Sequence, residues 1–541
     1  MIPAGKRQRE IESRRESLLP LLVLAGGLLA RLYEAWAYFL NPDEALHNLL
    51  ASQSSLTLSY KAALTNAHPP LLILVLYYWR SLGQSELMLR LPSVLAGTAC
   101  CWITYRWLKL VTDRSTALIG LLLLAFSPAL IELSAEVRQY ALLLLFMSSC
   151  LYLSERALRE NSSFLMVLFS LSLCGALLTH YSSLIFAFTM GVYMLVRLYP
   201  YGKRLRLVAV WGAGQIGALA LASYYLITHV AELKRRGMAQ GIAETWLRKS
   251  IFYADENHVL VFIAAQTLRV FTYLLSHGLC GTLALLAFLI GIISLLKWKR
   301  VSGEPRPSPR ELALLLGLPF VVNCGAALAG LYPYGGTRHN AFLALFALSG
   351  VAIGLSVRTP TREWIKPLIV VTCLAVCNFF PAPPPLIRPR NHHRVLMEQA
   401  MNYLRQSAPP GSIILADHES GLLLGYYACR QGVVQIFPPF VPLAQAQCGT
   451  YTVFTPPPDK WKYYADDVAS EVADIAATYH LAPETKIWLF DAGWIVDSTP
   501  ALRKQLQQLG CSAPQSFGEN IVLSQCAVGG NSDPAKISPS N

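Results

Sequence analysis

The chain has 541 residues, of which 54% are hydrophobic and only 14% charged, and its formal net charge is +13. A soluble domain usually carries about 25% charged residues, so this composition excludes an ordinary water-soluble protein. The basic excess does not indicate a nucleic-acid partner, because Lys and Arg collect in the cytoplasmic loops of membrane proteins. Composition therefore predicts an integral membrane protein whose first partner is the lipid bilayer.

About eleven apolar blocks have the length of a membrane-spanning helix. Blocks of roughly 18–22 residues can cross about 30 Å of hydrocarbon as α-helix. Helices are favoured over strands because each helix satisfies its own backbone hydrogen bonds in lipid. The blocks lie near residues 18–38, 88–108, 114–133, 138–154, 163–179, 181–199, 206–227, 279–296, 311–330, 339–356 and 364–381.

Basic residues predict the orientation of these spans. The segment 1–17 is rich in Lys and Arg, which places the N-terminus in the cytoplasm. Residues 69–82 are apolar for only about a dozen positions, and counting them as a span would reverse every later loop. We therefore interpret them as an interfacial or re-entrant helix on the outer side. In the long outer loop 228–278 we expect amphipathic helices that lie on the membrane.

Beyond residue 380 the pattern changes to that of a soluble domain. A Pro-rich connector covers 381–387, and 388–527 alternates short strands with helices, which predicts a small α/β domain outside the cytoplasm. We expect strands at 412–415, 486–490 and 521–523 and helices at 393–406 and 501–509, then a disordered tail over 528–541. In an oxidising compartment, one or two disulfides are expected, with the pairing left open, among Cys429, Cys448, Cys511 and Cys526.

The first outer loop carries two adjacent carboxylates, Asp43 and Glu44. Acids just beyond a span are costly to bury and free to face a cavity. One interpretation is structural, since Pro42 and Asp43 suit the start of a helix. The other is catalytic, because a carboxylate here could accept a proton from an acceptor hydroxyl or amine.

His68 stands immediately before Pro69-Pro70-Leu71. A double proline can simply mark the start of a helix, and the histidine is then incidental. As a functional residue, His68 could donate a hydrogen bond to a phosphate at the membrane surface. His180, at a later outer turn, is a candidate for lining a cavity, with an interfacial anchor as the alternative.

Two further outer turns contain arginines. Arg138 begins a span beside Glu136, where a cation suits a phosphate and interface snorkelling is the alternative. The last turn contains two glycines that let the backbone approach a ligand, followed by an Arg-His pair suited to a phosphate. These turns add Arg138, Arg338 and His339 as phosphate ligands and Glu136, Tyr140 and Tyr334 as acceptor or cavity residues.

Six short motifs follow one another along residues 18–380: Asp43-Glu44, His68-Pro69-Pro70-Leu71, Leu89-Arg90-Leu91-Pro92-Ser93, Phe126-Ser127-Pro128, Glu136-Val137-Arg138-Gln139-Tyr140 and Arg338-His339. In their order they resemble the GT-C superfamily of membrane glycosyltransferases. The protein O-mannosyltransferases and the bacterial transferases that add aminoarabinose to lipid A are the most similar groups. The chain departs from the aminoarabinose transferases at His68, where they have Lys, and from many relatives at His339, where they have Tyr.

The resemblance implies an all-α, GT-C-like membrane domain over 18–380 in a bacterial inner membrane. It implies inverting transfer of a sugar from a polyprenyl-phosphate donor to a glycan, lipid or protein acceptor. Asp43 would be the general base, with Glu44 beside it, and the basic candidates would stabilise charge on the leaving phosphate. Metal use varies in the superfamily, and no Asp-x-Asp pair occurs here, so we expect no obligatory metal or other cofactor.

Three alternatives remain open at this point. A lipid or polysaccharide transporter would need polar residues near mid-membrane, inverted repeats or broken helices, none of which the sequence reveals. A metal-dependent outer-leaflet enzyme would need a His and Asp cluster, and we interpret Asp417-His418-Glu419 as a solvated turn. A non-enzymatic assembly scaffold would retain its function when Asp43 is replaced by alanine.

Overall fold

The computed structural model describes residues 4–199, 204–235, 247–297, 306–357, 365–381, 392–429, 444–455, 468–493 and 511–528. The chain forms two compact units, each described by itself below. The first unit contains Met1–Ala35, Ala63–Val75 and Leu87–Pro389, and the second contains Trp36–Ala62, Leu76–Glu86 and Arg390–Asn541. The loop that follows α1 therefore belongs to the same unit as the C-terminal domain.

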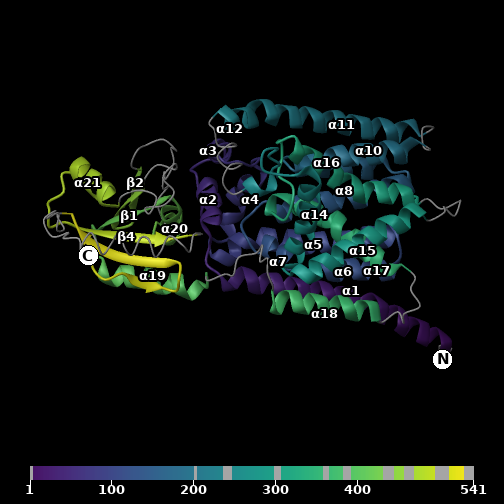
Figure 1. Ribbon diagram of the computed structural model, residues 1–541, viewed down its shortest axis with the longest axis horizontal. Coiled ribbons are helices and arrows are strands. Elements are labelled where there is room, and N and C mark those ends of the chain that lie inside the picture. The colour runs from purple at the N-terminus through teal and green to yellow at the C-terminus, as the bar shows by residue number, and fades with distance from the viewer. Residues whose placement is uncertain are drawn as a thin grey trace. The chain divides into compact units, whose positions relative to one another are not determined.

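Each predicted apolar block forms helix in the first unit (Figure 1). The main helices are α1 (Ala4–Ala37), α5 (Glu86–Val111), α6 (Arg114–Phe126), α7 (Pro128–Ser134), α8 (Tyr140–Glu160), α9 (Ser163–Leu177), α10 (Ser183–Leu198), α11 (Leu205–Tyr225), α14 (Val259–Leu275), α15 (Gly278–Lys297), α16 (Pro309–Leu328), α17 (Ala344–Ser356) and α18 (Ile365–Phe379). Within the described residues, seven helical stretches are long and apolar enough to cross a membrane, or eight if the bent pair α6–α7 is one span. A multi-pass membrane protein is thus confirmed, whereas the count of eleven spans is not.

Of the two segments expected to lie at the membrane surface, residues 69–82 agree with the prediction and residues 228–278 do not. Residues 69–82 form α4 (Leu71–Trp79) and the 3-10 turn Arg80–Leu82, and a helix this short agrees with an interfacial or re-entrant segment. The expectation for 228–278 was wrong over α14, which lies within the helical bundle in Figure 1 and contributes Phe262 and Phe271 to its core. The basic residues that suggested helices on the membrane surface, Lys234, Arg235, Arg236, Arg248 and Lys249, all precede α14.

A bend of 59° separates α6 from α7 at Ser127-Pro128. Proline lacks an amide hydrogen and cannot continue a helix, so the last carbonyls of α6 lose their helical partners. The guanidinium of Arg31 on α1 is buried and donates to Ala125 O at 2.7 Å and Leu124 O at 3.1 Å. A cation at a helix C-terminus also complements the helix dipole. Arg31 therefore stabilises the broken helix, a feature that the sequence did not reveal.

A buried charge network joins the C-terminal ends of α8 and α10 to the N-terminal end of α16. Arg197 Nη2 lies 2.8 Å from Glu155 Oε2, and its Nη1 lies 3.4 Å from Glu311 Oε2. The hydroxyl of Tyr193 donates to Glu155 Oε1 at 2.5 Å. Removing one member of such a network leaves an uncompensated buried charge, so we assign it a structural role.

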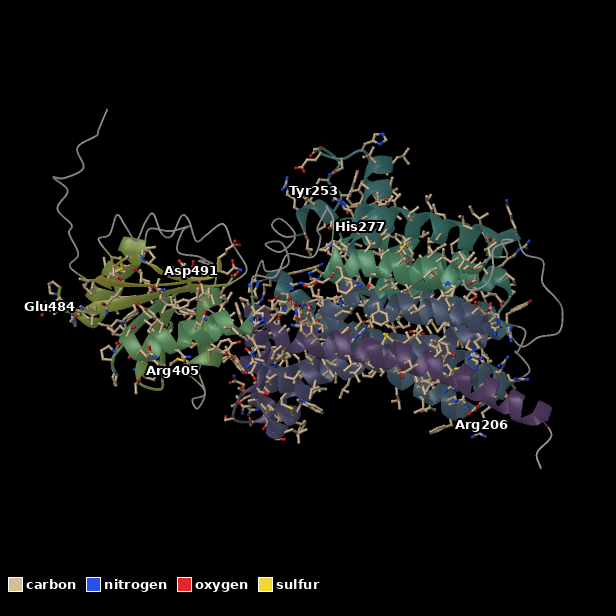
Figure 2. The ribbon with its side chains drawn as sticks, turned by 90° about the horizontal axis from the view of Figure 1, so that it is seen from below. Arg206, Tyr253, His277, Arg405, Glu484 and Asp491 are labelled. Atoms are coloured by element: carbon tan, nitrogen blue, oxygen red, sulfur yellow. A yellow bond between two sulfur atoms is a disulfide. The ribbon has the colours of Figure 1, made fainter. Side chains whose placement is uncertain are left out.

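The second unit contains a six-stranded sheet in the order β2-β3-β1-β4-β6-β5. Strand β1 pairs in parallel with β3 and β4, and the other pairs are antiparallel. The strands are β1 (Ile413–Ala416), β2 (Ala444–Cys448), β3 (Tyr451–Thr455), β4 (Lys486–Ala492), β5 (Gln515–Phe517) and β6 (Ile521–Ala527), with helices α19 (Arg394–Ser407), α20 (His418–Tyr427) and α21 (Val468–Tyr479). These strands and helices confirm the predicted α/β domain. In Figure 2 it can be found by the labels of Arg405 on α19 and Asp491 on β4. The expected helix 501–509 and nearly all of the tail 528–541 lie outside the described residues.

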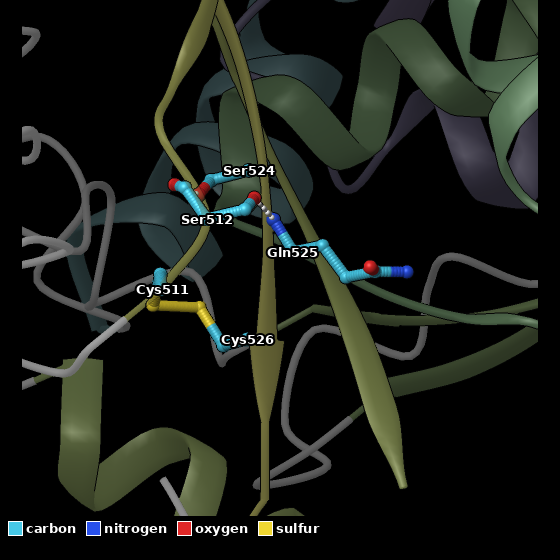
Figure 3. Close-up of a disulfide and its surroundings, with 5 residues drawn as sticks. All are labelled: Cys511, Ser512, Ser524, Gln525 and Cys526. Atoms are coloured by element: carbon cyan, nitrogen blue, oxygen red, sulfur yellow. Dashed lines mark hydrogen bonds between the residues drawn. A yellow bond between two sulfur atoms is a disulfide. The ribbon is translucent and has the colours of Figure 1, made fainter. Parts of the chain in front are cut away.

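All four cysteines of this domain form disulfides, Cys429–Cys448 and Cys511–Cys526. Figure 3 shows the second one beside Ser512, whose hydroxyl accepts a hydrogen bond from the amide of Gln525 at 2.9 Å. Covalent and hydrogen-bonded links thus attach the segment before β5 to β6.

The interpretation of Asp417-His418-Glu419 as a solvated turn was wrong. Asp417 is the N-cap of α20, its carboxylate accepting from Ser420 N at 2.8 Å, and His418 and Glu419 are buried in the first turn. Burial lowers the pKa of His418 to about 4. The carboxylate begins a buried helix because it satisfies one of the amides that a helix leaves unpaired.

Candidate active site

Asp43 and Glu44 lie in the first turn of α2 (Pro42–Ala51) in the second unit. Asn41 Oδ1 accepts from Glu44 N at 3.0 Å, and Glu44 Oε2 accepts from Asn41 N at 2.9 Å, which is a capping box. The carboxylate of Glu44 is buried and committed to holding the helix start, whereas Asp43 is half-buried. The structural and catalytic interpretations therefore divide between the two acids, and Asp43 is the better candidate for a base.

His47 lies one helical turn after Asp43 on α2 and is buried. Residues four apart share a face of a helix, so His47 stands on the same side of α2 as Asp43. His47 is not among the residues predicted from the sequence.

Four predicted residues come together in the first unit, and we call them the histidine cluster: His68, Tyr140, His180 and His339. The ring centroid of His68 lies 5.0 Å from that of His180 and 6.3 Å from that of His339. The His180 and His339 centroids are 6.0 Å apart, and the Tyr140 ring lies 5.4 Å from His180. These side chains come from four separate segments of the chain: the turn before α4, the start of α8, the α9–α10 turn and the 3-10 helix Arg338–Leu343.

Arg138 borders the histidine cluster. Its guanidinium carbon lies 5.7 Å from the centre of the Tyr140 ring, and the side chain is buried. Glu136, in the same turn, is also buried, and its carbonyl accepts from Arg138 N at 2.8 Å. Arg338 begins the 3-10 helix that continues with His339. Together, Arg138 and the cluster combine a buried cation with three imidazoles, a set suited to an anion.

His180 is neutral in this environment, because burial and the nearby charge of Arg138 lower its pKa to about 3. The amide of Ser182 donates to its Nδ1 at 3.1 Å, and the Ser182 hydroxyl lies 2.8 Å from the same atom. A neutral imidazole that accepts at Nδ1 carries its proton on Nε2. His180 is therefore a neutral N–H donor, and a donor fixed away from water is effective towards developing negative charge.

His229, which is not among the residues predicted from the sequence, connects the segments that carry His68 and His180. His229 Nε2 lies 2.9 Å from the carbonyl oxygen of Asn66, and its Nδ1 forms a hydrogen bond with the hydroxyl of Tyr181. A single turn of π-helix, Leu226–Val230, places this histidine at the end of α11. Such turns are frequent at functional sites, but no sequence signal marks them.

The segment with His339 is also fixed by polar contacts. The Tyr332 hydroxyl donates to the His339 carbonyl at 3.0 Å. One residue later, Asn340 Oδ1 accepts from Asn323 Nδ2 on α16 at 2.6 Å, and both amides are buried. These contacts anchor the segment from both sides.

The structure places Tyr334 against α14. Its hydroxyl lies 2.8 Å from that of Thr267, and its amide donates to Ser250 O at 2.7 Å. The following Gly335 has a φ of +131°, and a Cβ there would lie 2.2 Å from Gln266 Oε1. Only glycine adopts this backbone without strain, so the close approach to α14 explains the glycine at 335.

Residues 67–227 match the family model described as dolichyl-phosphate-mannose-protein mannosyltransferase. The resemblance to these membrane glycosyltransferases is thus confirmed. The matched segment contains His68, Arg138, Tyr140 and His180, and the match supports glycosyltransferase activity. No curated protein sequence matches the chain.

Solved structures similar to this chain include ArnT from Cupriavidus metallidurans bound to undecaprenyl phosphate, at 15% identity and a TM-score of 0.49, covering 93% of this chain and 97% of that one. The apo oligosaccharyltransferase of Archaeoglobus fulgidus has 12% identity and a TM-score of 0.46, covering 87% and 69%. The oligosaccharyltransferase AglB of the same organism, in complex with an inhibitory peptide and a dolichol-phosphate, has 11% identity and a TM-score of 0.45, again covering 87% and 69%. These likenesses are too weak to carry an argument about function.

Proposed function

We propose that the protein transfers a sugar from a polyprenyl-phosphate donor to a hydroxyl or amine acceptor at the outer face of a bacterial cytoplasmic membrane. The observation that carries the proposal is the convergence of His68, His180 and His339 beside Arg138. All of these except His339 belong to the segment that matches the mannosyltransferase model. The two disulfides support an outer location for the C-terminal domain, since disulfides persist in oxidising compartments.

In this proposal the histidine cluster and its arginines bind the donor phosphate. As the bond between the anomeric carbon and the phosphate oxygen breaks, negative charge grows on the leaving polyprenyl phosphate. Arg138 and Arg338 neutralise this charge, and the Nε2–H of His180 donates a hydrogen bond to it. His68 and His339 complete the donor set, and no metal ion is needed for this step.

Asp43 acts as the general base. It removes the proton from the acceptor oxygen or nitrogen while that atom forms a bond to the anomeric carbon from the face opposite the phosphate, so the configuration inverts. Glu44 holds the start of α2 through its capping box, which keeps Asp43 on an ordered first turn. Glu136 is our candidate for contact with the acceptor.

The test uses purified wild-type protein and Asp43→Asn with a panel of radiolabelled polyprenyl-phosphate sugars and native membranes as the source of acceptor. Asparagine keeps the size of the side chain but cannot take a proton. We expect wild-type transfer and a loss of about a hundredfold or more in the variant. Equal transfer by both proteins would remove Asp43 as the base, and no transfer from any carrier would overturn the proposed function.

A further inference from the structure

The backbone that leads into α2 is held by a tyrosine of the C-terminal domain. Tyr427, the last residue of α20, accepts a hydrogen bond from Leu40 N at 2.8 Å through its hydroxyl. The same hydroxyl donates to the carboxylate of Glu86, a charge-assisted contact. Leu40 directly precedes Asn41, the N-cap of the helix that carries Asp43. One hydroxyl thus links the entry of α2 to the start of α5.

Helix α20 is itself fixed on the sheet. The Ser420 hydroxyl donates to Ala492 O at 2.9 Å and accepts from Ala492 N at 2.8 Å at the end of β4. A Cβ on Gly421 would lie 2.2 Å from Thr455 Cγ2, so the helix and β3 are in close contact. At the other end, the disulfide from Cys429 begins two residues after Tyr427. Tyr427 is therefore a rigid anchor.

A second connection fixes the same stretch of the first loop. Phe39 N donates to His392 O at 3.0 Å, and Tyr38 forms an isolated antiparallel bridge with His393. The rings of Phe39 and His392 lie 5.0 Å apart. The residues before α2 are thus held by the segment that begins α19 as well as by α20.

We infer that Tyr427 is a positioning residue for the Asp43 carboxylate, so that the C-terminal domain sets the geometry of the base. This inference rests on the proposed role of Asp43. A general base must lie within hydrogen-bond reach of the proton it removes, and a misplacement of about 1 Å can cost on the order of a hundredfold in rate. Release of Leu40 would let the capping box and Asp43 shift together.

The adjacent Tyr426 provides a matched control. Its hydroxyl donates to Gln84 O at 2.7 Å, so it anchors the same domain but has its hydrogen bond on the segment before α5 rather than on the residue before α2. We compare Tyr427→Phe with Tyr426→Phe in full-length protein, after checking that both have the wild-type melting temperature within a few degrees. Each change removes one hydroxyl and keeps the ring.

We expect Tyr427→Phe to lower kcat by about tenfold or more with the donor KM unchanged, and Tyr426→Phe to stay within about twofold of wild type. Hydrogen exchange of the Leu40 amide should rise in Tyr427→Phe only. Equal effects of the two variants, or an effect on KM alone, would overturn the inference.

Asp43→Asn in the same assay separates this inference from the proposed function. An inactive Asp43→Asn together with fully active Tyr427→Phe would refute the positioning role and leave the base in place. A fully active Asp43→Asn would refute the base, and with it the positioning role.

Discussion

The imidazole of His68 stacks on that of His180, with ring centroids 5.0 Å apart and planes 29° apart. Neither residue lies within a long helix: one precedes the double proline before α4 and the other stands in the α9–α10 turn. Their contact is maintained by a backbone hydrogen bond of 3.1 Å from Leu71 N to Leu178 O and by the bridge through His229. The phosphate site that we propose is thus preorganised before any donor binds.

Two replacements of His180 should show whether it acts as a neutral hydrogen-bond donor or as a positive charge. His180→Leu removes the Nε2–H, and we expect kcat/KM to fall by about 10²–10³, as when one oxyanion donor is lost. His180→Gln offers an amide donor in a similar place and should retain more activity than His180→Leu. Steady-state transfer from a labelled donor measures both.

The pH dependence follows from the lowered pKa of His180. Because that pKa is about 3, the imidazole is neutral at every pH above about 4 and does not titrate in the working range. The acid limb of the rate profile should therefore be the same in wild type and His180→Gln. A limb that disappears in the variant would show that His180 works in its charged form.

The buried pair of Arg197 on α10 and Glu155 on α8 should contribute far more to the free energy of unfolding than an exposed pair within α8. We expect Arg197→Met to lower the free energy of unfolding by about 3–5 kcal/mol, because it leaves the Glu155 carboxylate without its cation. The control is Arg156→Met, which removes an i,i+4 pair with Glu160 in which both side chains are more than a third exposed and should cost less than about 1 kcal/mol. Denaturant titration of each variant in detergent measures its free energy of unfolding. Similar losses of stability in the two variants would contradict the prediction.

The disulfides allow a test of orientation. We expect a membrane-impermeant maleimide, applied to the outer face of intact cells, to label the protein only after reduction. A variant with serine at Cys429, Cys448, Cys511 and Cys526 is the control and should stay unlabelled. Labelling that occurs only when the reagent is applied to the cytoplasmic face would place the α/β domain inside.

Loss of either disulfide should also destabilise the domain by about 3 kcal/mol on the chain-entropy estimate for loops of 19 and 15 residues.

Chelation tests the expectation that no metal is obligatory. Among the described residues no group of three or more His, Cys, Asp or Glu side chains is arranged to hold a metal ion. Arginines and imidazole donors offer the positive potential that a metal would otherwise supply. We expect transfer to continue at an unchanged rate after treatment with EDTA. Loss of activity that Mg²⁺ or Mn²⁺ restores would contradict this.

Much of the membrane fold could be predicted because lipid leaves the backbone few choices. Each apolar block forms helix, and the turns between helices that were selected for their polar residues supplied the histidine cluster. The helix α14 was not predicted because it was treated as one loop together with the basic residues that precede it. Helices such as α9 and α10, with 15 and 16 residues, show why a number of spans cannot be read from apolar length alone.

Contacts between distant segments could not be predicted in the same way. His229 looks like any interfacial histidine until α11 brings it to Asn66 and Tyr181. The first acids of α20 looked solvated because burial depends on the sheet that packs against them. The division of labour between Asp43 and Glu44 likewise required the capping geometry, since their sequence context is shared.

Arg31 has a consequence for biosynthesis. Its acceptor Ala125 lies 94 residues further along the chain, so the first span is synthesised long before the carbonyls that compensate its charge. An arginine at the centre of a membrane helix costs about 2.5–3.5 kcal/mol during insertion. Arg31 lies six residues before the end of α1 rather than at its centre, so the nascent first helix bears a smaller penalty, which snorkelling of the side chain to the interface relieves until α6 has emerged. Assembly of α1 with α6 is therefore the step that compensates the charge of Arg31 within the bundle.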